Sequence, residues 1–149
     1  MPIKISLKKA NNADIEDLQL LEESVSAAKT YSPMLSEDEW IVALDIGTVY
    51  LIEVDGQTVG SLSIEPKKDA RVHVGGLVID PRFQGKGIGK KAMELALKEL
   101  TDAKTIDLAV HPENTRALKL YESLGFGVGE KKENYYGDGE PRLILELKK

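Results

Sequence analysis

The chain has 149 residues, of which 42% are hydrophobic, so we expect a single compact domain over residues 1–149. It contains no cysteine, which excludes disulfides, thiolate metal sites and a covalent cysteine nucleophile. A formal net charge of −5 disfavours binding to nucleic-acid phosphates and permits a cationic substrate. Because the sequence shows neither a leader nor a long apolar run, we expect a cytoplasmic monomer or homodimer that does not bind membranes.

The N-terminal part is predicted to contain one strand and two helices. Residues 3–7 are predicted to form a short strand. A helix over about 12–28 follows, because apolar residues recur there at helical spacing, namely Ile15, Leu18, Leu21 and Val25. A second, shorter helix begins at Ser36, since Ser36 and Glu39 have the spacing of a capping box.

The middle of the chain is predicted to form three strands and one helix. Residues 50–54 and 57–64 form a β-hairpin, because Asp55-Gly56 between them suits the positive φ angles of a tight turn. A third strand over 71–79 leads into a glycine-rich turn, followed by an amphipathic helix that ends near Leu100.

The last third is predicted to contain three strands and a helix. Residues 105–110 read as a buried strand, and the helix over 115–124 ends with Gly125 in the position of a C-cap. Two more strands lie near 126–133 and 142–147. This order of elements predicts a mixed sheet covered by helices, in the α/β (α+β) class.

The glycine-rich turn carries the clearest functional signal. Pro81 stops the preceding strand, and Gly85, Gly87 and Gly89 open directly into the next helix. Free backbone N–H groups and the positive end of the helix macrodipole favour a phosphate or pyrophosphate at such a place. Four basic residues add positive charge there: Arg82, Lys86, Lys90 and Lys91.

The spacing of these glycines excludes two common nucleotide sites. It is not Gly-x-x-x-x-Gly-Lys-Ser/Thr, which disfavours a P-loop hydrolase. It is not Gly-x-Gly-x-x-Gly on a first strand either, which disfavours a dinucleotide-binding unit. The remaining alternative is a plain tight turn between a strand and a helix, with lysines on a solvated face.

Two segments resemble the GNAT superfamily of N-acetyltransferases. Residues 78–89, Val-Ile-Asp-Pro-Arg-Phe-Gln-Gly-Lys-Gly-Ile-Gly, resemble its signature Gln/Arg-x-x-Gly-x-Gly/Ala. Residues 114–126, Asn-Thr-Arg-Ala-Leu-Lys-Leu-Tyr-Glu-Ser-Leu-Gly-Phe, resemble its Asn-x-x-Ala-x-x-Leu-Tyr-x-x-x-Gly-Phe segment. The resemblance covers essentially the whole chain. It implies a mixed sheet of six to seven strands flanked by about four helices, and an acetyl-CoA-dependent enzyme that acetylates a primary amine without a metal.

The resemblance also implies where acetyl-CoA binds. The strand before the turn would pair with the pantetheine arm, and the amides of the turn would hold the pyrophosphate. These cofactor-binding residues are Leu77, Val78, Ile79, Gln84, Gly85, Lys86, Gly87, Ile88, Gly89 and Lys90. Gly75-Gly76 inside the strand suggests a bulge, which fits the family's splayed strand.

Two residues of the second segment take roles by the same resemblance. Asn114 would lie near the pantetheine arm, although an Asn before a helix is also an ordinary N-cap. Tyr121 would reach the sulfur of coenzyme A and protonate the departing thiolate as the catalytic acid. Its alternative role is a core tyrosine on the apolar helix face.

The expected mechanism is direct attack by a neutral amine within a ternary complex, with the oxyanion held by a strand amide near Val78. The general base is not identified. Ala109 and Val72 occupy positions where related enzymes carry polar catalytic residues. The remaining candidates are His73, His111, Glu65 and Tyr31, and water is another.

The acceptor amine is the least determined feature. Asn134-Tyr135-Tyr136 resembles a segment of the N-terminal acetyltransferases, including the ribosomal-protein alanine acetyltransferases, in which the tyrosines line the peptide groove. Tyr135 and Tyr136 are therefore predicted to bind the acceptor. The alternative is an aromatic hairpin turn without such a role. The alternatives are a polyamine or aminoglycoside acetyltransferase and a non-catalytic acyl-CoA-binding module.

Overall fold

The computed structural model describes residues 4–28 and 30–149, which form one seven-stranded sheet and four α-helices. The strands are β1 (Ile5–Lys9), β2 (Thr48–Val54), β3 (Gln57–Pro66), β4 (Arg71–Ile79), β5 (Thr105–Val110), β6 (Gly127–Lys132) and β7 (Arg142–Lys148). The helices are α1 (Ile15–Ser24), α2 (Glu37–Ile46), α3 (Ile88–Glu99) and α4 (Thr115–Ser123), with short 3-10 turns η1 (Asn12–Asp14) and η2 (Pro81–Phe83). The predicted fold class is confirmed.

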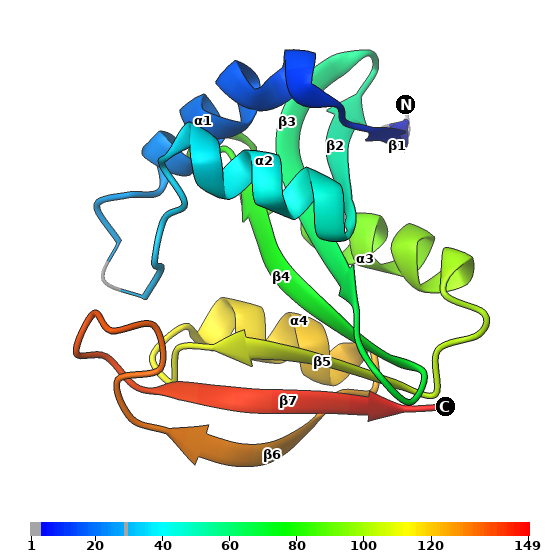
Figure 1. The fold of residues 1–149 in the computed structure, drawn as a ribbon, viewed down its shortest axis with the longest axis vertical. Helices are drawn as coiled ribbons and strands as arrows, with labels where there is room; N and C mark the ends of the chain where they lie inside the picture. Colours follow the sequence, from blue (N-terminus) through cyan, green and yellow to red (C-terminus); the bar gives the residue numbers. More distant parts are fainter. Residues whose placement is uncertain (1–3, 29) are drawn as a thin grey trace.

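The strands are ordered β1-β2-β3-β4-β5-β7-β6 across the sheet. Only β4 and β5 run parallel, and every other neighbouring pair is antiparallel. Figure 1 shows that β4 and β5 start together and then diverge, so β1–β4 and β5–β7 form two parts of one sheet. The loop between α1 and α2 and the loop between β6 and β7 lie at the open end of this gap.

Helices cover both faces of the sheet. The main core packs α3 against β2, β3 and β5, and its fully buried members include Ile52, Leu62, Ala92 and Ile106. A smaller core lies beneath α1 and α2 on the other face, around the buried Trp40. The alternation along β2 explains the two cores, because neighbouring side chains of a strand point to opposite faces.

The hairpin and the cap of α2 follow their sequence signals. Asp55 and Gly56 both have positive φ, at 49° and 86°, as the tight turn requires. The side chain of Ser36 accepts a hydrogen bond from the Glu39 amide at 3.1 Å, so the predicted N-cap forms. The return bond of a capping box does not form, because Glu39 Oε1 accepts from the Ser36 hydroxyl instead of the Ser36 amide.

Two predicted boundaries in the N-terminal part are wrong. The first strand begins at Ile5 and continues to Lys9, and residue 3 lies outside the described residues. The first helix ends at Ser24 instead of near residue 28. The hydroxyls of Ser24 and Ser26 bond to main-chain carbonyls three residues earlier, and such local bonds compete with helix continuation. Among the described residues, no helix is both long and apolar enough to cross a membrane.

Candidate active site

The glycine-rich turn connects the end of β4 to the start of α3. Gly85 and Gly87 adopt φ angles of 78° and 79°, in the left-handed region that only glycine occupies without strain. A Cβ on Gly87 would meet no atom within 4 Å, so that side of the helix start is open space. Gly89 differs, because a Cβ there would approach Leu120 Cδ1 to 3.3 Å. The first two glycines shape the turn, and the third lets α3 pack closely against α4.

The backbone amides of this turn have no acceptors. Gly87 is the N-cap of α3 and provides no side-chain cap, and the first helical bond runs from the Lys91 amide to the Gly87 carbonyl at 3.2 Å. Within the described part of the chain, the amides of residues 85–90 donate no hydrogen bond. Six successive amides at a helix N-terminus form a ready site for an anion.

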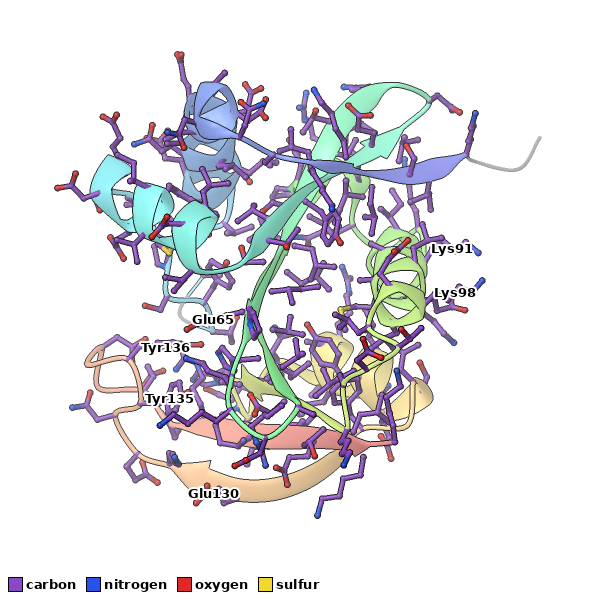
Figure 2. The ribbon with its side chains drawn as sticks, turned by 45° about the vertical axis from the view of Figure 1, so that its right-hand side comes forward. Glu65, Lys91, Lys98, Glu130, Tyr135 and Tyr136 are labelled. Atoms are coloured by element: carbon purple, nitrogen blue, oxygen red, sulfur yellow. The ribbon has the colours of Figure 1, made fainter. Side chains whose placement is uncertain are left out.

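The predicted positive charge is only partly available to such an anion. Arg82 forms an ion pair with Asp80, two residues earlier in the chain, at 2.9 Å. Lys91 points away from the molecule on the outer side of α3 (Figure 2). Lys86 and Lys90 remain exposed beside the free amides.

The splay between β4 and β5 opens a cleft along the second half of β4. The two strands pair from Arg71↔Thr105 to Val74↔Leu108 and then separate. The β3–β4 register passes from Ser63↔Gly76 to Ile64↔Val74, which leaves Gly75 unpaired. The predicted bulge is therefore present at Gly75. Beyond it lies a cleft of about 340 Å³ between the parting strands.

The cleft brings together several of the predicted site residues. Its walls include Leu77 and Val78 from β4 and Asn114 and Tyr121 from α4. Ala109 also lines the cleft, and its side chain offers no proton acceptor. Ile79 lies outside this lining, at the end of β4, where its carbonyl accepts from Gln84 Nε2 at 3.0 Å.

Tyr121 is held rigidly in the cleft wall. Its side chain is 7% exposed and packs edge-to-face against Phe126, with ring centroids 5.7 Å apart. Among residues 4–28 and 30–149 its hydroxyl has no hydrogen-bond partner. Burial raises the pKa of Tyr121 well above its usual value, so the hydroxyl keeps its proton at any ordinary pH. It is therefore available to donate to a ligand atom.

Asn114 takes its N-cap role at the start of α4. Its Oδ1 accepts from the Ala117 amide at 3.2 Å. The residue also lines the cleft, so both predicted roles are compatible with its position.

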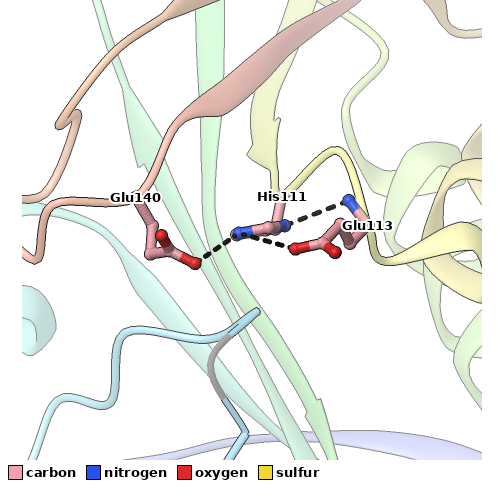
Figure 3. A group of neighbouring side chains, drawn as sticks. All are labelled: His111, Glu113 and Glu140. Carbon is pink, nitrogen blue, oxygen red and sulfur yellow. Dashed lines mark hydrogen bonds and ion pairs between the residues drawn. The ribbon is translucent and has the colours of Figure 1, made fainter.

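His111 forms a small polar cluster with Glu113 and Glu140 at the end of β5 (Figure 3). The Glu113 amide donates to Nδ1 at 3.0 Å, so in the neutral ring the proton must be on Nε2. Nε2 in turn donates to Glu140 Oε1 at 3.0 Å. Neither nitrogen is left to accept a proton or bind a metal. The cluster instead fastens the end of β5 to the segment before β7.

The loop between β6 and β7 presents one of its two tyrosines to the cleft. Tyr136 lines the cleft and lies beneath the guanidinium of Arg142, 5.0 Å from the ring centre. Arg142 is 2% exposed and pairs with Asp138 at 3.0 Å, so it holds the loop in place. Tyr135 packs edge-to-face on Tyr136 (Figure 2). It lines a pocket separate from the cleft.

Two of the candidate bases lie away from the cleft. His73 binds Asp107 through Nδ1 at 2.5 Å in the pocket that Tyr135 faces. Glu65 lies opposite His73 on β3 and bonds to Lys67. Val72 is buried in the main core.

The sequence analysis missed a buried carboxylate in the cleft. Glu22 on α1 is 4% exposed and accepts a hydrogen bond from the Tyr31 hydroxyl at 3.2 Å. Burial raises the pKa of Glu22 to about 7, while the Tyr31 hydroxyl and the Met34 amide oppose that rise and Glu39 adds to it. The signal was available, because position 22 follows Leu18 by four residues and falls on the apolar stripe of the helix.

This raised pKa predicts that ionisation of Glu22 destabilises the fold. The protonated carboxyl is favoured in the folded chain, so the contribution of Glu22 to stability is fully present below about pH 4.5 and is lost as pH rises through about 7. Relative to Glu22→Gln, the wild type should lose roughly 2–3 kcal/mol of unfolding free energy between about pH 5 and pH 8. Urea denaturation at both pH values measures this. Glu23→Gln, at an exposed neighbouring position, should show no such pH-dependent difference.

Comparison with known proteins identifies a family whose profile matches most of the chain. The sequence profile described as the acetyltransferase (GNAT) family matches residues 13–126. An uncharacterized N-acetyltransferase from Archaeoglobus fulgidus is 29% identical over 135 residues, covering 80% of this chain and 90% of its own length. Spermine/spermidine N(1)-acetyltransferase from Bacillus subtilis is 37% identical over 87 residues, covering 56% of this chain and 55% of its own length.

Solved structures show the same fold. The ribosomal-protein-S18-alanine N-acetyltransferase from Escherichia coli superposes with a TM-score of 0.82 at 22% identity, covering 97% of this chain and 94% of its own. A GNAT family acetyltransferase from Elizabethkingia anophelis with acetyl-CoA bound gives a TM-score of 0.76 at 18% identity, covering 97% and 98% of the two chains.

Proposed function

The chain belongs to the GNAT family of N-acetyltransferases, and on that premise we propose that it transfers an acetyl group from acetyl-CoA directly to a protein N-terminus. The observation that carries the cosubstrate half of the proposal is the row of free amides at residues 85–90. The space above Gly87 that a Cβ would enter fits a diphosphate. The cleft between β4 and β5, which is lined by Leu77, Val78 and Tyr121, is proposed to hold the extended arm.

The reacting carbon comes from the thioester that acetyl-CoA supplies when bound. Beyond Val74, β4 no longer pairs with β5, although Val78 still pairs with Ser61 of β3. An amide near Val78 that points toward the missing neighbour is proposed to stabilise the oxyanion. Tyr121 remains protonated and donates to the departing sulfur. These observations support a position for the thioester carbon between a β4 amide near Val78 and the hydroxyl of Tyr121.

The lack of a thiol supports direct transfer. The chain has no cysteine to carry an acetyl group, so we expect the amine to attack the thioester itself in a ternary complex. Incubation with acetyl-CoA alone should leave the mass of the protein unchanged. A stable increase by one acetyl group on a residue of the cleft would contradict direct transfer.

The open groove supports a peptide acceptor. Two loops line the cleft from opposite sides. Tyr31 and Met34 come from the loop between α1 and α2, and Tyr136 comes from the loop between β6 and β7. Figure 1 shows these two loops facing each other across the open end of the gap. Tyr136 is 45% exposed, and Arg142 fixes its ring, so an apolar surface is presented to an entering chain.

A panel of acceptors tests this proposal through release of free thiol from acetyl-CoA. Peptides with a free N-terminus should be acetylated, and the same peptides with a blocked N-terminus should not react. Mass spectrometry should place the acetyl group on the α-amine. A higher kcat/KM for spermidine or an aminoglycoside than for every peptide would contradict the peptide acceptor. Tight coenzyme A binding without turnover on any amine would indicate a binding module.

One observation favours a polyamine as the second candidate acceptor. The cleft contains two carboxylates, Glu22 and Glu39, and a polycation would pair with both. Spermidine therefore belongs in the panel as a competitor at equal concentration.

A further inference from the structure

Glu22 lines the cleft and carries an acceptor atom that no described group uses. Its Oε1 accepts from the Tyr31 hydroxyl, but its Oε2 is buried and makes no hydrogen bond within the described part of the chain. A buried, unpartnered carboxylate oxygen costs free energy, so natural proteins rarely keep one without a function. The oxygen is therefore a candidate for contact with a substrate.

The geometry directs this carboxylate toward the reacting strand. The Tyr31 hydroxyl lies over Gly76, since a Cβ built on Gly76 would be 3.3 Å from it. Gly76 precedes Val78 by two residues on the splayed part of β4. Glu22, Gly76, Val78 and Tyr121 all line the same cleft. An amine that attacks a carbonyl held at Val78 therefore enters a space bounded by Glu22.

We propose that Glu22 is the general base of the acetyl transfer, and this inference rests on the proposed function. As the amine nitrogen bonds to the thioester carbon, one N–H proton passes to the Glu22 carboxylate, directly or through one water. The C–S bond then breaks, and the sulfur takes its proton from Tyr121. Proton return from Glu22 to Tyr121 through solvent restores both groups, so the net reaction yields the amide and free coenzyme A.

The other polar groups of the cleft are less suited to this role. His111 uses both ring nitrogens in hydrogen bonds. The Tyr31 hydroxyl donates a hydrogen bond to Glu22, and burial raises the pKa of Tyr31 well above its usual value. Glu39 is exposed, and its Oε1 accepts from the Ser36 hydroxyl at 2.9 Å.

The ionisation of Glu22 supports the role independently of these contacts. A base with a pKa of about 7 is mostly ionised under physiological conditions and still holds a proton well. Tyr31 and Glu39 are the titratable groups that face it on its own side of the cleft. The far side adds four more groups, namely His111, Tyr121, Tyr136 and Arg142.

The first test compares Glu22→Gln with Glu23→Gln, which makes the same charge change at an exposed position of the same helix. Glu22→Gln should lower kcat by about 100-fold or more and leave the Kd for coenzyme A unchanged. In the wild type, kcat should rise with pH to a plateau above about pH 7, and this inflection should be lost in Glu22→Gln. Glu22→Asp should keep the inflection at a reduced rate. Glu23→Gln should match the wild type.

The acceptor's own ionisation is separated by changing the acceptor. An inflection that moves with the pKa of the amine belongs to the substrate, and one that stays belongs to the enzyme. If the only inflection moves with the amine, Glu22 is not the base.

The second test needs no turnover. In protein labelled with ¹³C at glutamate carboxyls, one resonance should titrate near pH 7 in the wild type and be missing in Glu22→Gln. That resonance should shift when an acceptor peptide is added to the coenzyme A complex. A Glu22 resonance that titrates near the normal range and ignores the peptide would overturn the inference.

The outcomes separate the two proposals. A wild type that acetylates no amine would overturn the proposed function, and the base assignment would fall with it. A wild type that turns over, with Glu22→Gln equally active at every pH, would overturn the base assignment alone.

Discussion

Replacing Gly87 with glutamate should weaken binding of coenzyme A by about 100-fold or more. The side chain would extend from the N-cap of α3 into the open space in front of the free amides, where the diphosphate is proposed to lie. A carboxylate about 5 Å from a phosphate, at an effective dielectric constant near 20, is repelled by about 3 kcal/mol. Isothermal titration calorimetry with coenzyme A measures the loss.

The control for this change is Gly87→Gln, which has the same shape without the charge. Both variants place a side chain at a φ of 79°, so both carry the same backbone strain. Glutamine should therefore bind coenzyme A more weakly than the wild type, and glutamate should bind it about 100-fold or more weakly than glutamine because of the charge repulsion. Equal affinities for wild type and glutamate variant would show that the diphosphate does not lie at this turn.

Replacing Tyr121 with phenylalanine should lower kcat by about 10-fold or more and hardly change the Kd for coenzyme A. The substitution keeps the ring that packs on Phe126 and removes only the hydroxyl. That hydroxyl has no protein partner in the described residues, so its loss leaves no buried group unsatisfied and should not destabilise the fold. A lower rate is then attributable to the reaction itself.

Steady-state thiol release over a range of acetyl-CoA concentrations separates kcat from KM for this variant. Tyr50→Phe is a matched control, because Tyr50 lies on β2 outside the cleft lining. Its rates should equal those of the wild type. Should Tyr121→Phe do the same, Tyr121 would have only a packing role.

Local signals in the sequence located most elements of the fold. Asp55-Gly56 fixed a hairpin because its positive φ angles match the twist of the strands on either side. The alternating glycines and the N-cap Asn114 marked both helix starts that border the cleft. These features depend on a few neighbouring residues, so they can be predicted without knowledge of tertiary contacts.

Features that depend on distant contacts were not predictable in this way. The insertion of β7 between β5 and β6 depends on pairing across the chain, as in Ile106↔Leu147, and leaves no local pattern. Glu22 was overlooked because the first helix was identified by its apolar members, although a carboxylate on that stripe is itself informative. The separation of Tyr135 from Tyr136 depends on how Arg142 anchors their loop.

Four residue pairs, from Arg71↔Thr105 to Val74↔Leu108, form the strand pairing that joins the two parts of the sheet. The pantetheine arm of acetyl-CoA, if hydrogen-bonded to the free edge of β4, would occupy the place of a missing strand. It would extend the contact between the two parts of the sheet beyond the β4–β5 pairing. Binding energy and folding energy are then linked, because a ligand of the native state alone raises its stability in proportion to the logarithm of its concentration. Cellular levels of coenzyme A would thus set how firmly the two halves of the protein hold together.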